Sequence, residues 1–219
     1  LLGSRITGDG TDTVTVEGPI RESHAEYRII PDRIVASTLA CAAAATGGDV
    51  ELRGVDPTHF STVLHFLKLA GCDIISSKRS VRLRSDGKLT AVGEISTSPY
   101  PGFPTDLQSV FLAAEAAGSG ESRFKETVYE ARFEAAMRLA AFGADVSVHK
   151  DTAIIKGRYP LVPGIAETPD LRGGAALLVA ALAADGLSVI SDRGHLRRGY
   201  EDIGRDLRKL GADIEEDEL

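Results

Sequence analysis

Apolar and polar positions along the chain follow a pattern that recurs at intervals of about 70 residues. Each unit contains a helix that is apolar almost all round, a short strand, a helix with one apolar face, and an alternating hairpin. An all-apolar helix is typical of a buried position, so these three helices are predicted to lie inside the domain. They are expected at Ile34–Ala45, Leu107–Ala117 and Leu171–Ala184.

The remaining elements of each unit are predicted from the same periodicities. The strands are expected at Asp49–Gly54, Glu121–Tyr129 and Leu187–Asp192. The outer helices, which alternate charged and apolar faces, are expected at His59–Ala70, Phe133–Phe142 and Tyr200–Leu210. The hairpins are expected at Asp73–Leu83 and Asp145–Ile155, and in the third unit only a strand stub remains, at Ile214.

One short phrase, a glycine between a helix and an alternating strand, occurs four times. A residue at this place adopts the left-handed conformation, which favours glycine. Polar turns at Asp9-Gly10 and Lys78-Arg79 then lead into second strands. Leu1-Leu2-Gly3 reads as the end of a helix, so the chain is expected to be a piece of a longer one. The four glycines are Gly3, Gly71, Gly143 and Gly211.

The repeats predict one α/β domain at residues 31–219, built from three units at about 31–93, 94–160 and 161–219. Residues 1–30 are expected to be the end of the preceding domain's last repeat. The chain would cross between the two domains at Arg28–Pro31.

Composition narrows the class of protein. A formal charge of −7 argues against a general nucleic-acid binder, and no apolar run is long enough to span a membrane. The two cysteines, Cys41 and Cys72, do not suggest a disulfide framework or a metal site. We therefore expect a cytoplasmic protein that uses no metal and no cofactor.

An aspartate stands at the start of each predicted inner helix. The ordinary interpretation of such an aspartate is an N-cap. Three helix N-termini on one face would also suit an anionic ligand, because each carries partial positive charge and free N–H groups. Arginines gather at the same junctions, although a single arginine is usually a solvated surface charge. The aspartates are Asp32, Asp106 and Asp170, and the arginines are Arg33, Arg132, Arg172 and Arg198.

Four motifs resemble the C-terminal half of the UDP-N-acetylglucosamine enolpyruvyl transferases, within the enolpyruvyl transferase family. The resemblance covers essentially the whole chain with its spacing intact. It implies an inverse α/β barrel domain, one of two similar domains, each with three units around buried parallel inner helices. The site would lie in the cleft between the two. The motifs are Pro31–Arg33, Phe103–Gln108, Asp170–Arg172 and His195–Tyr200.

The resemblance implies transfer of an enolpyruvyl group from phosphoenolpyruvate to the 3-hydroxyl of UDP-N-acetylglucosamine, with release of phosphate, the first committed step of peptidoglycan synthesis. Asp106 matches the proposed general base, Asp170 matches a second carboxylate, and Arg198 matches the arginine that follows the phosphate. The implied partners are the two substrates and the missing N-terminal half. The other implied binding residues are Asp32, Arg33, Val128, Arg132 and Arg172.

The chain departs from the family pattern at Ala131 and Arg197, and Gly173-Gly174 is expected to loosen its helix. The family's N-terminal half, which holds a phosphoenolpyruvate-binding lysine and a mobile loop with the residue that acts as the acid, usually a cysteine, is expected to be missing from this sequence. We therefore expect the isolated chain to be inactive. Two alternatives stay open: an enzyme like 3-phosphoshikimate 1-carboxyvinyltransferase, and a non-catalytic fragment or paralogue that binds a ligand or a partner.

Overall fold

The computed structural model describes residues 3–18, 24–130 and 132–217. They form two compact units, Leu1–Pro31 and Asp32–Leu219. In the first unit, β1 (Arg5–Thr7) pairs antiparallel with β2 (Thr15–Glu17). The predicted turn at Asp9-Gly10 lies between these strands, whereas the helix end predicted at Leu1-Leu2 lies outside the described residues. The assignment of residues 1–30 to a preceding domain stays a prediction.

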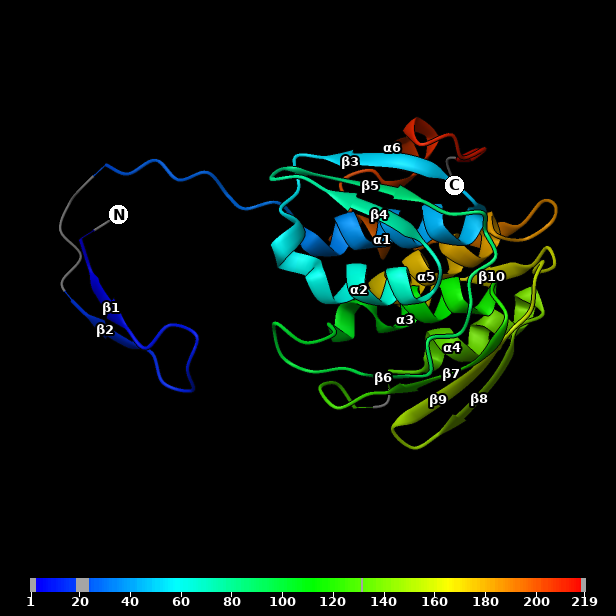
Figure 1. Ribbon diagram of the computed structural model, residues 1–219, viewed down its shortest axis with the longest axis horizontal. Helices are drawn as coiled ribbons and strands as arrows, with labels where there is room; N and C mark the ends of the chain where they lie inside the picture. The colour runs from blue at the N-terminus through cyan, green and yellow to red at the C-terminus, as the bar shows by residue number, and fades with distance from the viewer. Residues whose placement is uncertain (1–2, 19–23, 131, 218–219) are drawn as a thin grey trace. The chain divides into compact units, whose positions relative to one another are not determined.

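Three inner helices form the centre of the second unit, as the sequence predicts (Figure 1). They are α1 (Arg33–Thr46), α3 (Thr105–Ala116) and α5 (Leu171–Leu182), and each packs against the other two. In α3 every residue from Leu107 to Ala116 is buried. A helix without an exposed face is stable only when neighbours cover it on all sides, which explains its apolar sequence.

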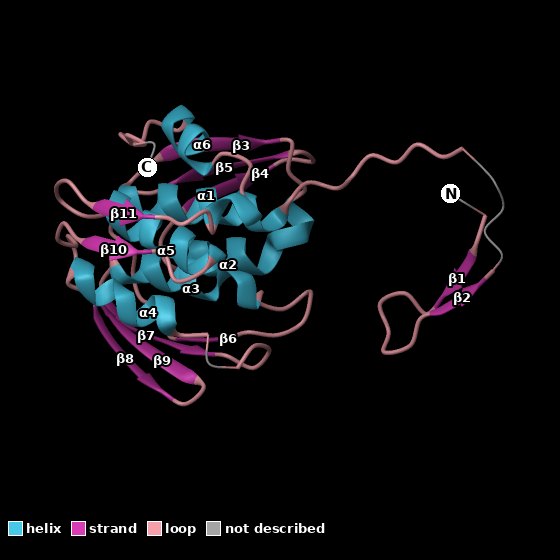
Figure 2. Ribbon diagram, turned by 180° about the vertical axis from the view of Figure 1, so that it is seen from behind, coloured by secondary structure: helices cyan, strands magenta, loops and turns pink. Residues whose placement is uncertain are grey.

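Three sheets surround these helices, one for each repeat (Figures 1 and 2). The first has the order β3 (Asp49–Arg53), β5 (Ser80–Arg84) and β4 (Asp73–Ser76). The second has the order β6 (Glu94–Ser96), β7 (Gly120–Lys125), β9 (Thr152–Gly157) and β8 (Asp145–His149). The third is a parallel pair, β10 (Ile165–Glu167) and β11 (Val189–Ser191).

The predicted outer helices are all present, and two of them include a turn of 3₁₀ helix. They are α2 (Ser61–Leu69) after a 3₁₀ turn at Pro57–Phe60, α4 (Glu134–Arg138) before one at Leu139–Phe142, and α6 (Ile203–Lys209). In α2 the buried residues Val63, Leu64 and Leu67 lie on one face, as the amphipathic pattern predicts.

The four glycines that punctuate the repeats all have positive φ angles, between 74° and 104°. At Gly71 and Gly143, which lie between a helix and a strand, this confirms the predicted left-handed residue; Gly211 follows α6 without a strand after it, and the helix predicted before Gly3 lies outside the described residues. Gly173 and Gly174, residues that disfavour a helix, are both buried inside α5 with little room for a side chain. A Cβ on Gly173 would lie 2.4 Å from Cγ of Pro169, so glycine permits close packing of the helix start rather than only loosening it.

Two strand predictions are wrong, and two further strands were not predicted. The strand predicted at Glu121–Tyr129 ends at Lys125, because the Glu126 carboxylate accepts N–H groups of Val128 and Tyr129 and turns the chain. No strand forms at Ile214 in the described segment 212–217, whose Ile214 carbonyl accepts from Arg208 of α6. The strands β6 and β10 were not predicted, because three residues are too few to show a period.

No helix in the described parts of the chain has the length and apolar character needed to cross a membrane.

Candidate functional site

Two of the three helix-start aspartates are N-caps, as their ordinary interpretation predicts. Oδ1 of Asp32 accepts hydrogen bonds from the N–H groups of Ile34 (2.7 Å) and Val35 (3.1 Å) at the start of α1. Oδ1 of Asp170 accepts from the N–H groups of Arg172 and Gly173, both at 2.8 Å, at the start of α5. Their carboxylates therefore satisfy free N–H groups of their own helices.

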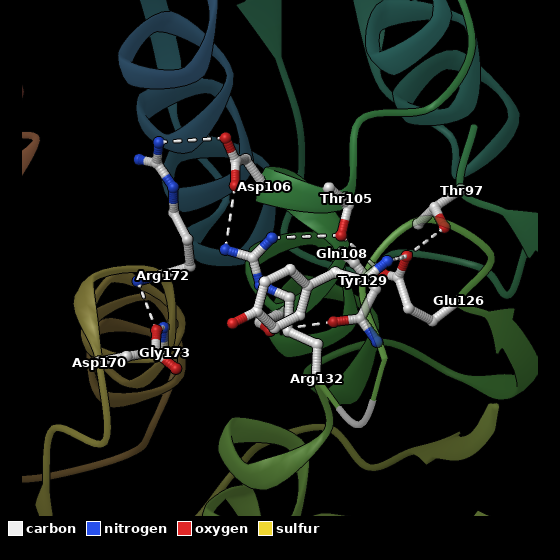
Figure 3. Close-up of polar contacts among 11 residues, drawn as sticks. Thr97, Thr105, Asp106, Gln108, Glu126, Tyr129, Arg132, Asp170, Arg172 and Gly173 are labelled. Atoms are coloured by element: carbon white, nitrogen blue, oxygen red, sulfur yellow. Dashed lines mark hydrogen bonds and ion pairs between the residues drawn. The ribbon is translucent and has the colours of Figure 1, made fainter. Parts of the chain in front are cut away.

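Asp106 is different, and the N-cap interpretation is wrong for it. The N-cap of α3 is Pro104, so the helix has already begun at Thr105 and Asp106 lies in its first turn. Its carboxylate instead contacts two arginines outside α3, namely Arg132 of the same repeat and Arg172 of the third repeat (Figure 3). Oδ1 lies 2.9 Å from Nη2 of Arg132, and Oδ2 lies 3.3 Å from Nη2 of Arg172.

This cluster combines access to solvent with strong positive charge. The side chain of Asp106 is 39% exposed, whereas those of Arg132 and Arg172 are 17% and 15% exposed. Burial alone would raise the pKa of Asp106, but the two guanidinium groups outweigh it and hold that pKa below its usual value. Two cations on one carboxylate leave a net positive charge, so the cluster suits an anionic group such as a carboxylate or phosphate.

Aromatic rings hold the two guanidinium groups in place. The guanidinium of Arg132 lies 5.0 Å from the centre of the Tyr129 ring, and that of Arg172 lies 6.0 Å from the Tyr200 ring. The hydroxyl of Tyr200 in turn lies 2.9 Å from Oγ1 of Thr38, on α1. Through these contacts elements from all three repeats converge on the starts of the inner helices.

A second carboxylate, Glu126, lies behind the cluster and was not singled out from the sequence. Its side chain is buried, with 5% of the residue exposed, and it joins Thr97 to Thr105 through its two oxygens (Figure 3). Thr105 in turn accepts a hydrogen bond from Arg132. The sequence offered one signal for it, a glutamate within a segment predicted as a strand. A glutamate that is buried there needs several hydrogen-bond donors around its carboxylate.

Among the described residues, none of the other predicted site residues forms a hydrogen bond or ion pair with the Asp106 carboxylate. Arg33 stacks on the Tyr100 ring, with 5.1 Å from the guanidinium carbon to the ring centre. Val128 is exposed, and its N–H donates to Glu126. Arg198 lies in a 3₁₀ turn at Leu196–Arg198, is exposed, and forms no ion pair with any residue that the structure describes. The departure at Ala131 lies outside the described residues.

Comparison with known proteins identifies the family of the chain. The family model described as EPSP synthase (3-phosphoshikimate 1-carboxyvinyltransferase) matches residues 1–207. The chain belongs to the enolpyruvyl transferase family. As an enolpyruvyl transferase domain, it has a mixed α/β fold in which the arginine-bound Asp106 lies at the start of a central helix.

Curated relatives of this enolpyruvyl transferase chain include two named UDP-N-acetylglucosamine 1-carboxyvinyltransferase. The relative from Xanthobacter autotrophicus is 39% identical over 98% of the chain and 50% of its own length. The relative from Geotalea daltonii is 41% identical over 98% of the chain and 51% of its own length. The chain thus spans about half the length of the relatives it matches.

Two solved structures give the same result for the fold. The enolpyruvyl transferase NikO from Streptomyces tendae superposes with a TM-score of 0.84 at 29% identity, over 98% of this chain and 51% of that one. EPSP synthase from Acinetobacter baumannii superposes with a TM-score of 0.73 at 19% identity, over 99% of this chain and 53% of that one. At 19% identity the second match supports the fold alone.

Proposed function

We propose that this chain is one half of an enzyme that transfers the enolpyruvyl group of phosphoenolpyruvate to the 3-hydroxyl of UDP-N-acetylglucosamine. The observation that carries the proposal is the position of Asp106. Its carboxylate is accessible to solvent at the start of an inner helix and forms ion pairs with two arginines. The curated relatives named for the UDP-sugar reaction support this acceptor over 3-phosphoshikimate. In this proposal the enzyme works in the cytoplasm, in peptidoglycan synthesis.

The roles of the three clustered side chains follow from their chemistry. With both arginines on its oxygens, Asp106 is a weak base, because a lowered pKa reduces its affinity for a proton. A substrate carboxylate that binds Arg132 and Arg172 would compete with Asp106 for their N–H groups. Asp106 would then be released to accept the proton of the sugar hydroxyl.

The reaction that we propose has two steps. The sugar oxygen bonds to C2 of phosphoenolpyruvate as Asp106 takes the hydroxyl proton, while C3 receives a proton from an acid. The tetrahedral adduct then loses a proton from C3 and expels phosphate, which restores the double bond. The positive groups stabilise the anionic substrate and its transition states. Arg198, which is exposed and unpaired within the described residues, would bind the phosphate.

The remaining residues have supporting roles in the proposal. Asp170 would place its carboxylate beside the reacting groups while it caps α5. Val128 would contact the UDP-sugar through its carbonyl, because its N–H is already bonded to Glu126. Asp32 and Arg33 would line the same cleft at the hinge between the domains.

The proposal also includes the finer architecture. The repeated element order and the mutual packing of the inner helices support an inverse α/β barrel of three units. A second domain would complete the cleft and supply the acid and a phosphoenolpyruvate-binding lysine. The chain alone would therefore be inactive, as its half-length coverage of the relatives suggests.

The decisive experiment measures phosphate release by the complete protein that carries this chain, given phosphoenolpyruvate and one acceptor at a time. We expect turnover with UDP-N-acetylglucosamine and none above background with 3-phosphoshikimate. Turnover with 3-phosphoshikimate alone would transfer the assignment to that branch. Absence of turnover with both, together with retained binding of the UDP-sugar, would favour a non-catalytic binding protein.

A further inference from the structure

The buried carboxylate of Glu126 accepts hydrogen bonds from four donors. Oε1 accepts from the Thr97 hydroxyl at 2.6 Å and from the N–H groups of Val128 at 2.9 Å and Tyr129 at 3.0 Å. Oε2 accepts from the Thr105 hydroxyl at 2.8 Å. The two oxygens thus have separate tasks, since one shapes the segment after β7 and the other reaches the first residue of α3.

The hydrogen bond between Glu126 and Thr105 determines whether the Thr105 hydroxyl can accept a hydrogen bond from Arg132. Nη1 of Arg132 lies 3.2 Å from Oγ1 of Thr105, and a guanidinium group can only donate. A hydroxyl has one proton, so Thr105 offers a lone pair to Arg132 only when its proton points elsewhere. The Thr105 hydroxyl donates its hydrogen bond to Oε2 of Glu126, which leaves a lone pair on the side of Arg132.

We propose that Glu126 is a positioning residue, which acts through Thr105 to hold the Arg132 guanidinium against Asp106. The inference rests on the proposed function, in which Arg132 binds the substrate carboxylate. The same carboxylate also fixes the N–H of Tyr129, whose ring stacks on Arg132. Glu126 therefore supports that guanidinium from two sides, through Thr105 and through Tyr129.

A purely structural role for Glu126 would be limited to its Oε1 bonds. Glu126→Gln separates the two roles, because the amide oxygen can replace Oε1 while the NH₂ group replaces Oε2. The NH₂ group cannot accept from Thr105, so the hydroxyl must reverse and direct its proton at Arg132. The turn after β7 is then retained, and the contact between Thr105 and Arg132 is lost.

The test is a double-mutant cycle in the complete protein with Glu126→Gln, Thr105→Val and the pair, because valine matches threonine in shape but lacks the hydroxyl. We expect each single variant to lower kcat/KM for phosphoenolpyruvate about tenfold or more, the scale of a lost charge-assisted hydrogen bond. The pair should be no worse than either single variant, with the KM for the UDP-sugar and the unfolding temperature close to wild type. If the loss of kcat/KM in the double variant equals the product of the two single losses, Glu126 does not act through Thr105.

The matched control is Glu121→Gln, which changes an exposed glutamate of β7 in the same repeat. This variant should leave kcat/KM unchanged for both substrates. A similar loss in this control would assign the effect of Glu126→Gln to surface charge. A drop in unfolding temperature with equal losses for both substrates would assign Glu126 a structural role only.

A second readout separates the positioning role from the proposed function, because it needs no turnover. In protein labelled with ¹³C at aspartate carboxyl groups, the Asp106 signal is identified by its absence in Asp106→Asn, and its pKa is titrated. Loosening Arg132 removes a cation from Asp106, so this pKa should rise in Glu126→Gln and in Thr105→Val but not in Glu121→Gln. If the wild type shows no transfer but the pKa rises as expected, the function fails and the positioning holds. An unchanged pKa overturns the positioning.

Discussion

The two ends of helix α3 carry carboxylates in opposite electrostatic states. At the N-terminal end Asp106 lies between two arginines, which hold its pKa below the usual value despite the opposing effect of burial. At the C-terminal end Glu115 is only 3% exposed, and burial raises its pKa to about 7 although Ser122 donates to Oε2 at 2.6 Å. Oε1 of Glu115 has no hydrogen-bond partner among the described residues.

The difference shows that burial and neighbouring charges set the pKa of a carboxylate in an apolar helix. The helix dipole acts in the same direction, since it favours an anion at the N-terminal end and disfavours one at the C-terminal end. The polar groups near Glu115 include Cys41 and Cys72, buried thiols whose pKa values burial also raises, to about 11 for Cys72. One end thus favours a charged carboxylate and suits anionic ligands, whereas at the other end burial favours the neutral form of Glu115.

The largest expected effect is on catalysis at the N-terminal end. Asp106→Asn in the complete protein should lower kcat by about 10²-fold or more, because an amide cannot act as a general base. Binding of the UDP-sugar should persist, since the amide can still form a hydrogen bond with the hydroxyl. Steady-state kinetics and calorimetry measure the two effects.

The matched control for Asp106→Asn is Asp145→Asn, at the exposed start of β8, which should leave kcat unchanged. Because Asp106 is not a cap, its replacement should change the free energy of unfolding by less than about 1 kcal/mol. Near-normal kcat in Asp106→Asn would contradict the proposed role of Asp106 as the general base.

The second prediction concerns pH and the C-terminal end. The folded pKa of Glu115 lies above its unfolded value of 4.5, so the folded state binds more protons between pH 4.5 and about pH 7. Stability from this group is therefore present below that window and is lost as the pH rises through it. Glu115→Gln should make the protein more stable than wild type at pH 8 by about 2–3 kcal/mol, with little gain at pH 5.

Urea unfolding at the two pH values measures this effect. Glu121→Gln is again the control, because it removes an exposed carboxylate of the same repeat and should show no difference between the two pH values. If Glu115→Gln raises the free energy of unfolding equally at pH 5 and pH 8, the pKa of Glu115 is not raised in the folded state.

The third prediction concerns Arg198, in the 3₁₀ turn that packs against α5, and asks whether this arginine has a specific role. Arg198→Ala should weaken phosphoenolpyruvate binding by about 1.5–3 kcal/mol, as expected for a charge-assisted hydrogen bond. Arg197→Ala, in the same exposed turn, should cost well under about 1 kcal/mol. Calorimetric titration in the presence of the UDP-sugar separates them, and equal losses would indicate a diffuse patch without a specific role for Arg198.

The smallest effect distinguishes a capping aspartate from Asp106. Asp32→Ala removes two hydrogen bonds to the first turn of α1 and should cost about 1 kcal/mol of stability. Thermal unfolding of this variant beside Asp106→Asn makes the comparison direct. If the two substitutions destabilise the protein equally, Asp106 does not differ from a cap in its contribution to stability.

The sequence by itself determined the repeated elements, since each depends on local periodicity or local backbone conformation. The three inner helices follow from apolar runs, and Gly71 and Gly143 follow from the left-handed residue that a helix-to-strand junction requires. The capping of α1 and α5 by Asp32 and Asp170 is equally local, because each carboxylate bonds N–H groups only two and three residues away.

The tertiary structure alone decided which side chains meet. Asp106 and Arg172 are 66 positions apart in the chain, and no local pattern brings their side chains to 3.3 Å. The end of the strand predicted through Glu126 depends only in part on local bonds, because its carboxylate accepts hydrogen bonds from the Thr97 and Thr105 hydroxyls on other segments as well as from N–H groups of its own turn. Periodicity records how each segment faces the core, whereas long-range pairing of charges depends on how the packed helices place their ends.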